Sequence, residues 1–219
     1  MKYSTFVLLI IFAVSSSCTQ AQNQASNVAT TQVAKKLSKN SKLKKAYFAS
    51  GCFWCVEAVY ESVKGVEESI SGYAGGHTKN PSYEDSNTGR TGHAEAVEIY
   101  YDPEIVSFST LVDVYFGSQN ITQVNGQGPD RGSQYRSIIF YQSEEEKNII
   151  ESKVAALNAQ LSPQKVAAEI MPFDKFWIGE DYHQNYERLH PNQGYIRGVS
   201  IPRLNRFKQK FPELLKDDH

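Results

Sequence analysis

Between residues 46 and 173, short apolar runs alternate with longer segments whose apolar residues recur about every 3.6 positions. The short runs are typical of buried strands, and the periodic segments are typical of helices with one apolar face. The expected strands are 46–50, 66–73, 93–102, 135–142 and 166–173. The expected helices are one that begins near Cys52 and ends at Gly65, one at 107–119, one behind 143–146, and one at 204–215.

Two helices have strong local signals. Residues 107–119 carry a continuous apolar stripe formed by Phe108, Leu111, Val112, Tyr115 and Phe116. Ser143 and Glu146 match a capping box at the start of the next helix. A long Gly-rich loop, AGGHTKNPSYEDSNTGRTG, follows the second strand, and residues 174–202 look irregular and rich in aromatic residues.

The order of these elements is β-α-β-β-α-β-α-β. Helices that return the chain to one sheet predict an α+β fold, a two-layer sandwich of the split βαβ (ferredoxin-like) type with a long irregular C-terminal region. The helices should lie on one face of the sheet. A doubly wound sheet is the alternative.

The N-terminus has the pattern of an export signal over residues 1–18. Lys2 precedes an apolar run at 6–14, which is followed by three serines and Cys18. The run is far shorter than the ~20 residues that span a bilayer, so the membrane is expected to be reached only through a lipid. Cys18 resembles the lipidated cysteine of a bacterial lipobox, although Ser15 stands where a larger aliphatic residue is usual. Cleavage after Ala21 is the alternative.

Residues 19–45 have few large apolar side chains and end in a basic cluster, which predicts a flexible tether. The catalytic domain is then 46–219. We expect an exported protein, anchored to a bacterial membrane and facing the periplasm or the outside, with a secreted or periplasmic protein as the alternative.

Composition agrees with one globular domain and narrows the partners. The chain has 219 residues, of which 40% are hydrophobic, enough for a single core. Its net charge is -1, from 23 basic and 24 acidic residues, so nothing favours nucleic acid. A monomer is expected.

The stretch GCFWCVEAVY (51–60) places two cysteines at the junction of a strand and a helix. A disulfide between Cys52 and Cys55 would close too small a loop to stabilise the fold much. A metal site is not expected, because no second cysteine pair is present and His183 and His190 are too far apart for the usual zinc spacing. Free N–H groups at a helix start should lower the pKa of Cys52 and make it a nucleophile.

A thioredoxin-like thiol exchanger is one interpretation of this pair. It is weakened by the absence of a preceding βαβ unit and by the bulk of Phe53 and Trp54. These two rings instead suggest the wall of a pocket for an apolar group. A cysteine hydrolase that uses Cys52 with His183, and a non-catalytic binding domain, are further alternatives.

Several separated blocks resemble the A-class peptide methionine sulfoxide reductases over roughly residues 46–198. The blocks are GCFW with VE, SGYAGGHTKNPSYEDSNTGRTGHAEAVEIYYDP, DRGSQYRSIIFY, EDYHQNY and HPNQGY. The resemblance implies reduction of the S epimer of methionine sulfoxide, free or in proteins, with no cofactor. It makes Cys52 the nucleophile and Glu95 the acid. The implied substrate-binding residues are Phe53 and Trp54 around the methyl group, Tyr83 and Tyr135 on the sulfoxide oxygen, and Asp130, with His183 in a supporting role.

Glu95 also has a rationale of its own. In a strand at 94–101 it shares a face with Val97, Ile99 and Tyr101, while Glu98 points the other way. A carboxyl group on an apolar face loses hydration, which raises its pKa and lets it donate a proton near neutral pH. If the strand begins at Ala96, Glu95 is instead solvated.

The chain departs from its relatives in the cysteine that completes the cycle. Many relatives have glycine at the position of Cys55 and carry cysteines after a GY pair, but here Ile196 follows Gly194-Tyr195. We expect Cys55 to condense with a sulfenic acid on Cys52, giving a disulfide that a thioredoxin-like dithiol reduces. The alternative is an inert Cys55, with Cys52 reduced directly.

Overall fold

The computed structural model describes residues 30–217. The residues of the predicted export signal, with Cys18, lie outside the described residues. The centre of the fold is a six-stranded sheet in the order β7-β6-β1-β3-β2-β8, in which all neighbouring strands are antiparallel except β6 and β7. The strands are β1 (Lys44–Ala49), β2 (Val66–Ala74), β3 (Ala94–Tyr101), β6 (Ile138–Tyr141), β7 (Glu169–Pro172) and β8 (Phe176–Ile178).

The predicted α+β sandwich of the split βαβ type is confirmed. β3 separates β1 from β2, although helix α2 (Phe53–Glu61) connects those two strands in the sequence. Every residue of β3 is buried, because its two faces pack against two different clusters. Glu95 therefore lies on the strand that has the least access to water.

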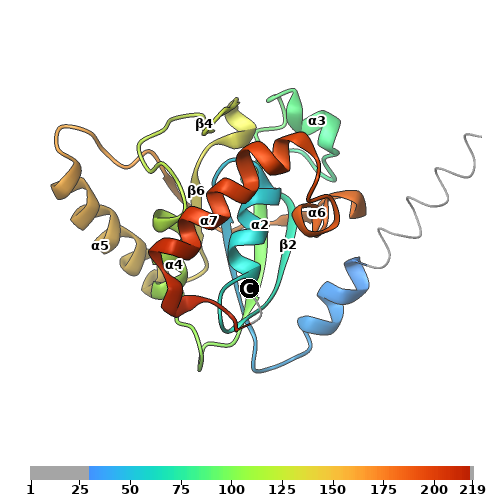
Figure 1. Ribbon diagram of the computed structural model, residues 1–219, viewed down its shortest axis with the longest axis horizontal. Helices are drawn as coiled ribbons and strands as arrows, with labels where there is room; N and C mark the ends of the chain where they lie inside the picture. The colour runs from blue at the N-terminus through green and yellow to red at the C-terminus, as the bar shows by residue number, and fades with distance from the viewer. Residues whose placement is uncertain (1–29, 218–219) are drawn as a thin grey trace, which may run out of the picture.

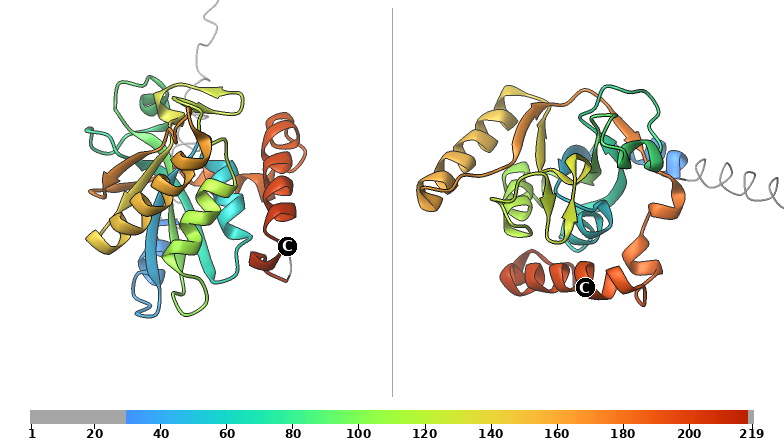
Figure 2. Two further views of the ribbon diagram at one scale, coloured as in Figure 1. Left: turned by 90° about the vertical axis from the view of Figure 1, so that its left-hand side faces the viewer. Right: turned by 90° about the horizontal axis from the view of Figure 1, so that it is seen from above.

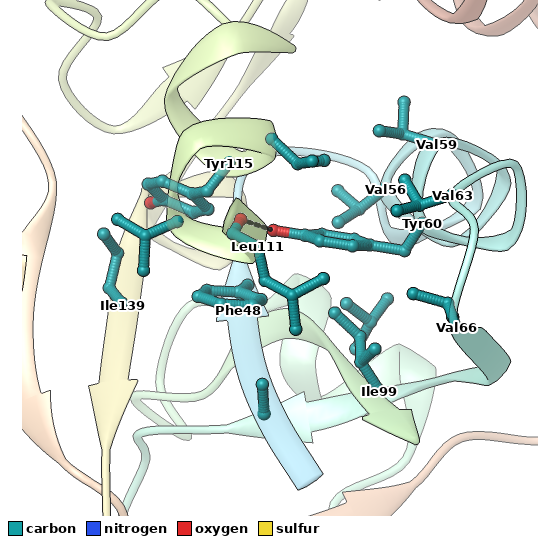
Figure 3. Packing of buried hydrophobic residues seen from close by; sticks show 14 of the residues in the cluster. Phe48, Val56, Val59, Tyr60, Val63, Val66, Ile99, Leu111, Tyr115 and Ile139 are labelled. Atoms are coloured by element: carbon teal, nitrogen blue, oxygen red, sulfur yellow. Dashed lines mark hydrogen bonds between the residues drawn. The ribbon is translucent and has the colours of Figure 1, made fainter. Parts of the chain in front are cut away.

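Helices α2 and α4 (Phe108–Gly117) cover one face of the sheet, and α7 (Ile201–Lys210) lies outside α2 as a further layer (Figures 1 and 2). The core between them is aromatic and aliphatic. Phe48 stacks on Tyr60, and the Tyr60 hydroxyl donates a hydrogen bond to the carbonyl of Leu111 at 3.1 Å (Figure 3). This packing fixes α2, and with it the cysteine pair, against the sheet.

The opposite face of the sheet is also covered, which the sequence did not predict. Residues 30–37 are helical, and Ala34 is buried against this face. The Tyr100 hydroxyl donates to the carbonyl of Ala34. The expected tether of 19–45 is thus structured in its described part, because its few apolar residues find a partner in the sheet.

The loops and the C-terminal region contain short elements that the sequence analysis treated as irregular. These are α3 (Tyr83–Asn87), β4 (Gly126–Gln127), β5 (Asp130–Arg131), the 3-10 helices Ser133–Tyr135 and Asp181–His183, α6 (Tyr186–Leu189) and the π-helix Ile196–Ser200. The helix expected at 204–215 is observed as α7 followed by the 3-10 helix Pro212–Leu214. Tyr135 ends a 3-10 helix instead of opening a strand, and α5 (Glu144–Leu161) follows Ser143 as expected. No helix within residues 30–217 is long and apolar enough to cross a membrane.

Candidate active site

The cysteine pair lies where β1 turns sharply into α2. Gly51 has a φ of 79°, a conformation that side chains rarely adopt, and a Cβ there would lie 2.5 Å from the Cβ of Gln127. Cys52 is the N-cap of α2, and its side chain caps no backbone group of the helix. The turn thus leaves the Cys52 sulfur free to react at the helix start.

The two sulfurs share one proton. Burial raises the pKa of the Cys52 thiol, and so does the hydrogen bond between Cys52 and Cys55. The same hydrogen bond lowers the pKa of Cys55 to about 6. At neutral pH the pair therefore holds one negative charge on Cys55, with Cys52 as the donor. The expected low pKa of Cys52 is wrong in this resting state, because burial of the thiol outweighs any effect of the helix start and the hydrogen bond with Cys55 acts in the same direction.

Side chains from the C-terminal region surround Cys55. The Tyr195 hydroxyl lies 3.7 Å from the Cys55 sulfur and donates to Asp130 Oδ2 at 2.6 Å. Ser200 and the positive charge of Arg203 also lower the pKa of Cys55. The Ser200 hydroxyl itself donates to Glu187. Burial raises the pKa of Asp130. The structure thus brings Asp130 to the Cys55 side of the pair through Tyr195.

Glu95 is buried close to Cys52, as the alternation along its strand predicted. Its side chain is on the face of Val97, Ile99 and Tyr101, and it is 2% exposed. Burial raises the pKa of Glu95 to about 8, although the hydrogen bond from the Phe53 N–H at 3.0 Å acts in the opposite direction. The carboxyl group is therefore protonated at neutral pH and can donate to an oxygen bound near Cys52.

Phe53 and Trp54 belong to a cluster of rings. Trp54 stacks on Tyr186 with a centroid distance of 3.8 Å and donates from Nε1 to His183 Nδ1 at 3.1 Å. His183 packs against Phe53 at 4.8 Å, and burial lowers the pKa of His183 to about 4. A neutral His183 thus accepts from Trp54 and orients its ring.

Tyr83 and Tyr135 meet although they come from different loops. Their hydroxyl groups hydrogen-bond each other, and burial raises the pKa of both, with smaller contributions in the same direction from the nearby Glu95 and Cys52. α3 carries Tyr83, and Ser82 caps it in a capping box with Asp85. Two hydroxyl groups and one carboxyl group thereby converge near the nucleophile.

Three charged side chains that position these groups were not identified from the sequence: Glu180, Glu57 and Arg203. Glu180 accepts from the Tyr83 N–H at 2.9 Å and from the Tyr73 hydroxyl at 2.8 Å. Glu57 accepts from Ser71 and from the backbone of Asn185, and burial raises its pKa. Glu180 lies in the block EDYHQ and Glu57 follows FWCV, so both were visible there, whereas Arg203 had no such signal.

No group of three or more His, Cys, Asp or Glu side chains between residues 30 and 217 is arranged to hold a metal ion. The site contains a buried thiol, a thiolate, a neutral carboxyl group and hydroxyl donors. Such a set can attack an electrophilic atom and protonate an oxygen attached to it.

Comparisons with known proteins agree with this chemistry. The profile of the family described as "Peptide methionine sulfoxide reductase" matches residues 44–215. The peptide methionine sulfoxide reductase MsrA of Pasteurella multocida is 43% identical over 78% of this chain and 98% of the relative. That of Polynucleobacter asymbioticus is 45% identical over 79% and 92%.

Solved structures are similar as well. Methionine sulfoxide reductase A of Corynebacterium diphtheriae has a TM-score of 0.64 and 32% identity, and the match covers 71% of this chain and 78% of that one. Reduced Mxr1 of Saccharomyces cerevisiae has a TM-score of 0.61 and 30% identity, and covers 71% and 90%.

Proposed function

The chain belongs to the peptide methionine sulfoxide reductase family, and from this premise we propose how its own residues reduce methionine sulfoxide to methionine. The Cys52 sulfur attacks the sulfur of the substrate, and the substrate is the S epimer, free or in oxidised proteins under repair. The observation that carries the proposal is the buried, neutral Glu95, which hydrogen-bonds the residue next to the nucleophile.

The first half-reaction moves two protons and one oxygen. As Cys52 attacks, its proton passes to the Cys55 thiolate, and Glu95 gives its proton to the sulfoxide oxygen. The hydroxyl group so formed passes from the substrate sulfur to the Cys52 sulfur. The sulfur–oxygen bond of the substrate and the transient bond between the two sulfurs break, methionine leaves, and Cys52 becomes a sulfenic acid. Tyr83 and Tyr135 donate hydrogen bonds to the oxygen while Phe53 and Trp54 hold the methyl group.

The second half-reaction uses Cys55. Its sulfur attacks the sulfenic sulfur of Cys52, and water leaves with the hydroxyl of the sulfenic acid and the proton of Cys55. The products are a Cys52–Cys55 disulfide and a Glu95 carboxylate that takes a proton from solvent. Cys55 is suited to this role because the positive charge of Arg203 stabilises its thiolate. A thioredoxin-like dithiol then supplies the two electrons that reopen the disulfide.

The test is turnover of the separated sulfoxide epimers with dithiothreitol, comparing wild type with Cys52→Ser and Cys55→Ser. We expect no turnover in the first variant. After one equivalent of substrate and no reductant, wild type should be lighter by two hydrogen atoms, and Cys55→Ser should be heavier by one oxygen atom. A stable oxygen adduct in wild type would remove Cys55 from the mechanism.

We also propose that the chain is exported and anchored through a lipid on Cys18, with the catalytic domain acting as a monomer outside the cytoplasm. The support is the pattern of residues 1–18. The measurement is the membrane fraction of cells that produce wild type or Cys18→Ala. Release of wild type and variant into the same soluble fraction would exclude the anchor.

A further inference from the structure

A cavity of about 710 Å³ reaches Cys55 from the side of α7. Its lining residues come from α7, the segment at the C-terminal end of α4 and the β4–β5 hairpin. Figure 1 shows where α7, α4 and β4 lie in the fold. Its volume is in the range of small-molecule sites. Cys55 lines this cavity, although its side chain is only 2% exposed. A small molecule can therefore meet the sulfur at the inner end of the cavity.

Three cations line the cavity: Arg203, Arg206 and Lys210. Arg203 donates hydrogen bonds to Ser50 and Ser118 and is therefore not available to a ligand. Arg206 and Lys210 are exposed, and neither forms an ion pair with any described residue. The one acidic lining residue, Asp130, accepts a hydrogen bond from Tyr195. The Lys210 ammonium group lies 5.2 Å from the centre of the Phe211 ring. The cavity thus offers a ligand two positive charges that no described carboxylate pairs with.

The amide side chains of the cavity add hydrogen-bonding groups. Gln119, Gln123 and Gln127 line its wall, and Gln127 is held by hydrogen bonds to Gln119 and Asn120. Amides and cations together suit a ligand with carboxylate groups. A thiol with such groups could place its sulfur at Cys55 and its charges at α7.

We propose that this cavity is the binding site of a low-molecular-weight anionic thiol that reduces the enzyme, in addition to any protein dithiol. The inference rests on the proposed Cys52–Cys55 disulfide. The thiolate of the ligand attacks the Cys55 sulfur, the Cys52–Cys55 bond breaks, and its electron pair leaves on Cys52. A second ligand thiolate attacks the ligand sulfur of the mixed disulfide, which releases the Cys55 thiolate and a ligand disulfide. The substrate and this reductant then use different sulfurs.

The experiment begins with protein whose cysteine pair has been oxidised by diamide, so that it does not depend on sulfoxide turnover. Intact mass verifies the disulfide. Its reduction is then timed with 2-mercaptoethanesulfonate and with uncharged 2-mercaptoethanol at low salt. The double variant Arg206→Gln/Lys210→Gln should lower the rate of reduction by 2-mercaptoethanesulfonate by roughly two- to fivefold per charge removed, as expected for exposed ion pairs. The rate with 2-mercaptoethanol should not change, which also shows that the variant is folded.

Lys208→Gln is the matched control, because it removes a charge from the same helix but does not line the cavity. It should leave both rates unchanged. Fragment masses of the trapped mixed disulfide should locate the sulfonate on Cys55. Equal slowing by Lys208→Gln, no effect of the double variant, an adduct on Cys52, or failure of diamide to form the disulfide would each overturn the inference. Failure of sulfoxide turnover with these results intact would overturn only the proposed function.

Discussion

The start of α2 holds the acid of the proposed reaction as well as its nucleophile. Phe53 provides one of the free N–H groups of the first turn, and this group binds the Glu95 carboxyl group. Such a hydrogen bond favours the carboxylate, but burial has the larger effect and raises the pKa of Glu95 to about 8. The result is an acid that is oriented by the helix and still protonated at neutral pH.

Glu95→Gln should lower kcat by roughly 10²- to 10⁴-fold, the usual contribution of a general acid. In wild type, kcat should fall as pH rises through about 8, because Glu95 loses its proton there. Glutamine keeps an acceptor for the Phe53 N–H but has no proton to transfer, so this alkaline limb should disappear. The measurement is kcat for the sulfoxide from neutral to alkaline pH. An alkaline limb that persists in the variant would assign the titration to another group.

Stability provides the control for this variant. The pKa of Glu95 in the folded protein lies above its ordinary value of 4.5, so wild type has the full contribution of Glu95 below 4.5 and loses it as pH rises through about 8. The glutamine variant has no such loss. It should unfold at the same or a higher urea concentration than wild type at alkaline pH, which separates a missing acid from a misfolded site.

His183 should act on binding through Trp54. His183→Ala removes the acceptor of the Trp54 N–H and should raise KM for the sulfoxide about fivefold, as expected for one hydrogen bond of ~1 kcal/mol. His183→Asn offers an amide oxygen close to the position of Nδ1 and should restore most of the lost affinity. Steady-state kinetics of the two variants measures this. Equal KM values in both variants would mean that the ring of His183 matters for packing alone.

α7 and the π-helix before it supply three residues that act on the pKa of Cys55. Tyr195 precedes the π-helix, Ser200 ends it, and Arg203 lies in the first turn of α7; all three lower the pKa of Cys55. Arg203 is buried and has no carboxylate partner among the described ion pairs. A buried cation requires compensation, and the Cys55 thiolate provides a nearby negative charge.

Arg203→Met should destabilise the fold and raise the pKa of Cys55 above 6. The loss leaves the carbonyl groups of Ser50 and Ser118 without their donor, at a cost of roughly 1–3 kcal/mol each. Urea unfolding measures the first effect, and the pH dependence of iodoacetamide labelling at Cys55 measures the second. Arg206→Met, on the exposed side of the same helix, is the control and should change neither. An unchanged labelling profile in Arg203→Met would show that the charge does not act on Cys55.

The helices and strands that could be predicted from the sequence are those in which the local spacing of apolar residues determines the structure. Side chains alternate between the two faces of β3, so the faces of Glu95 and Glu98 could be assigned correctly. The apolar stripe of α4 likewise identified that helix. The short elements after Asp174 depend on distant partners instead. Gln184, for example, exchanges hydrogen bonds with the backbone of Ser71 on β2. No local period reports such a contact, and the same holds for the position of Arg203 against Ser50.

The sulfurs of Cys52 and Cys55 are approached by different parts of the molecule. Tyr83 and Tyr135 reach the side of Cys52 from loops above the sheet, while Arg203 and the cavity reach Cys55 from α7. In the proposed cycle, the sulfoxide oxidises the Cys52 sulfur and the reducing thiol attacks the Cys55 sulfur. The three-residue spacing of Cys52 and Cys55 on one helical turn is what allows both within a single small domain.

The segment before β1 should stabilise the domain without taking part in its chemistry. A chain that begins at Lys44 lacks the helix at 30–37 and uncovers part of the sheet face that packs against Ala34. It should be less stable than a chain that begins at Thr30 by roughly 1–3 kcal/mol, the contribution of one or two buried apolar side chains. Urea unfolding of both chains measures this difference, and kcat with dithiothreitol should be the same in both. Equal unfolding midpoints would mean that residues 30–43 act only as the tether that their composition predicts, whereas a lower kcat would mean that the contact between Thr30 and Asp181 helps to position His183.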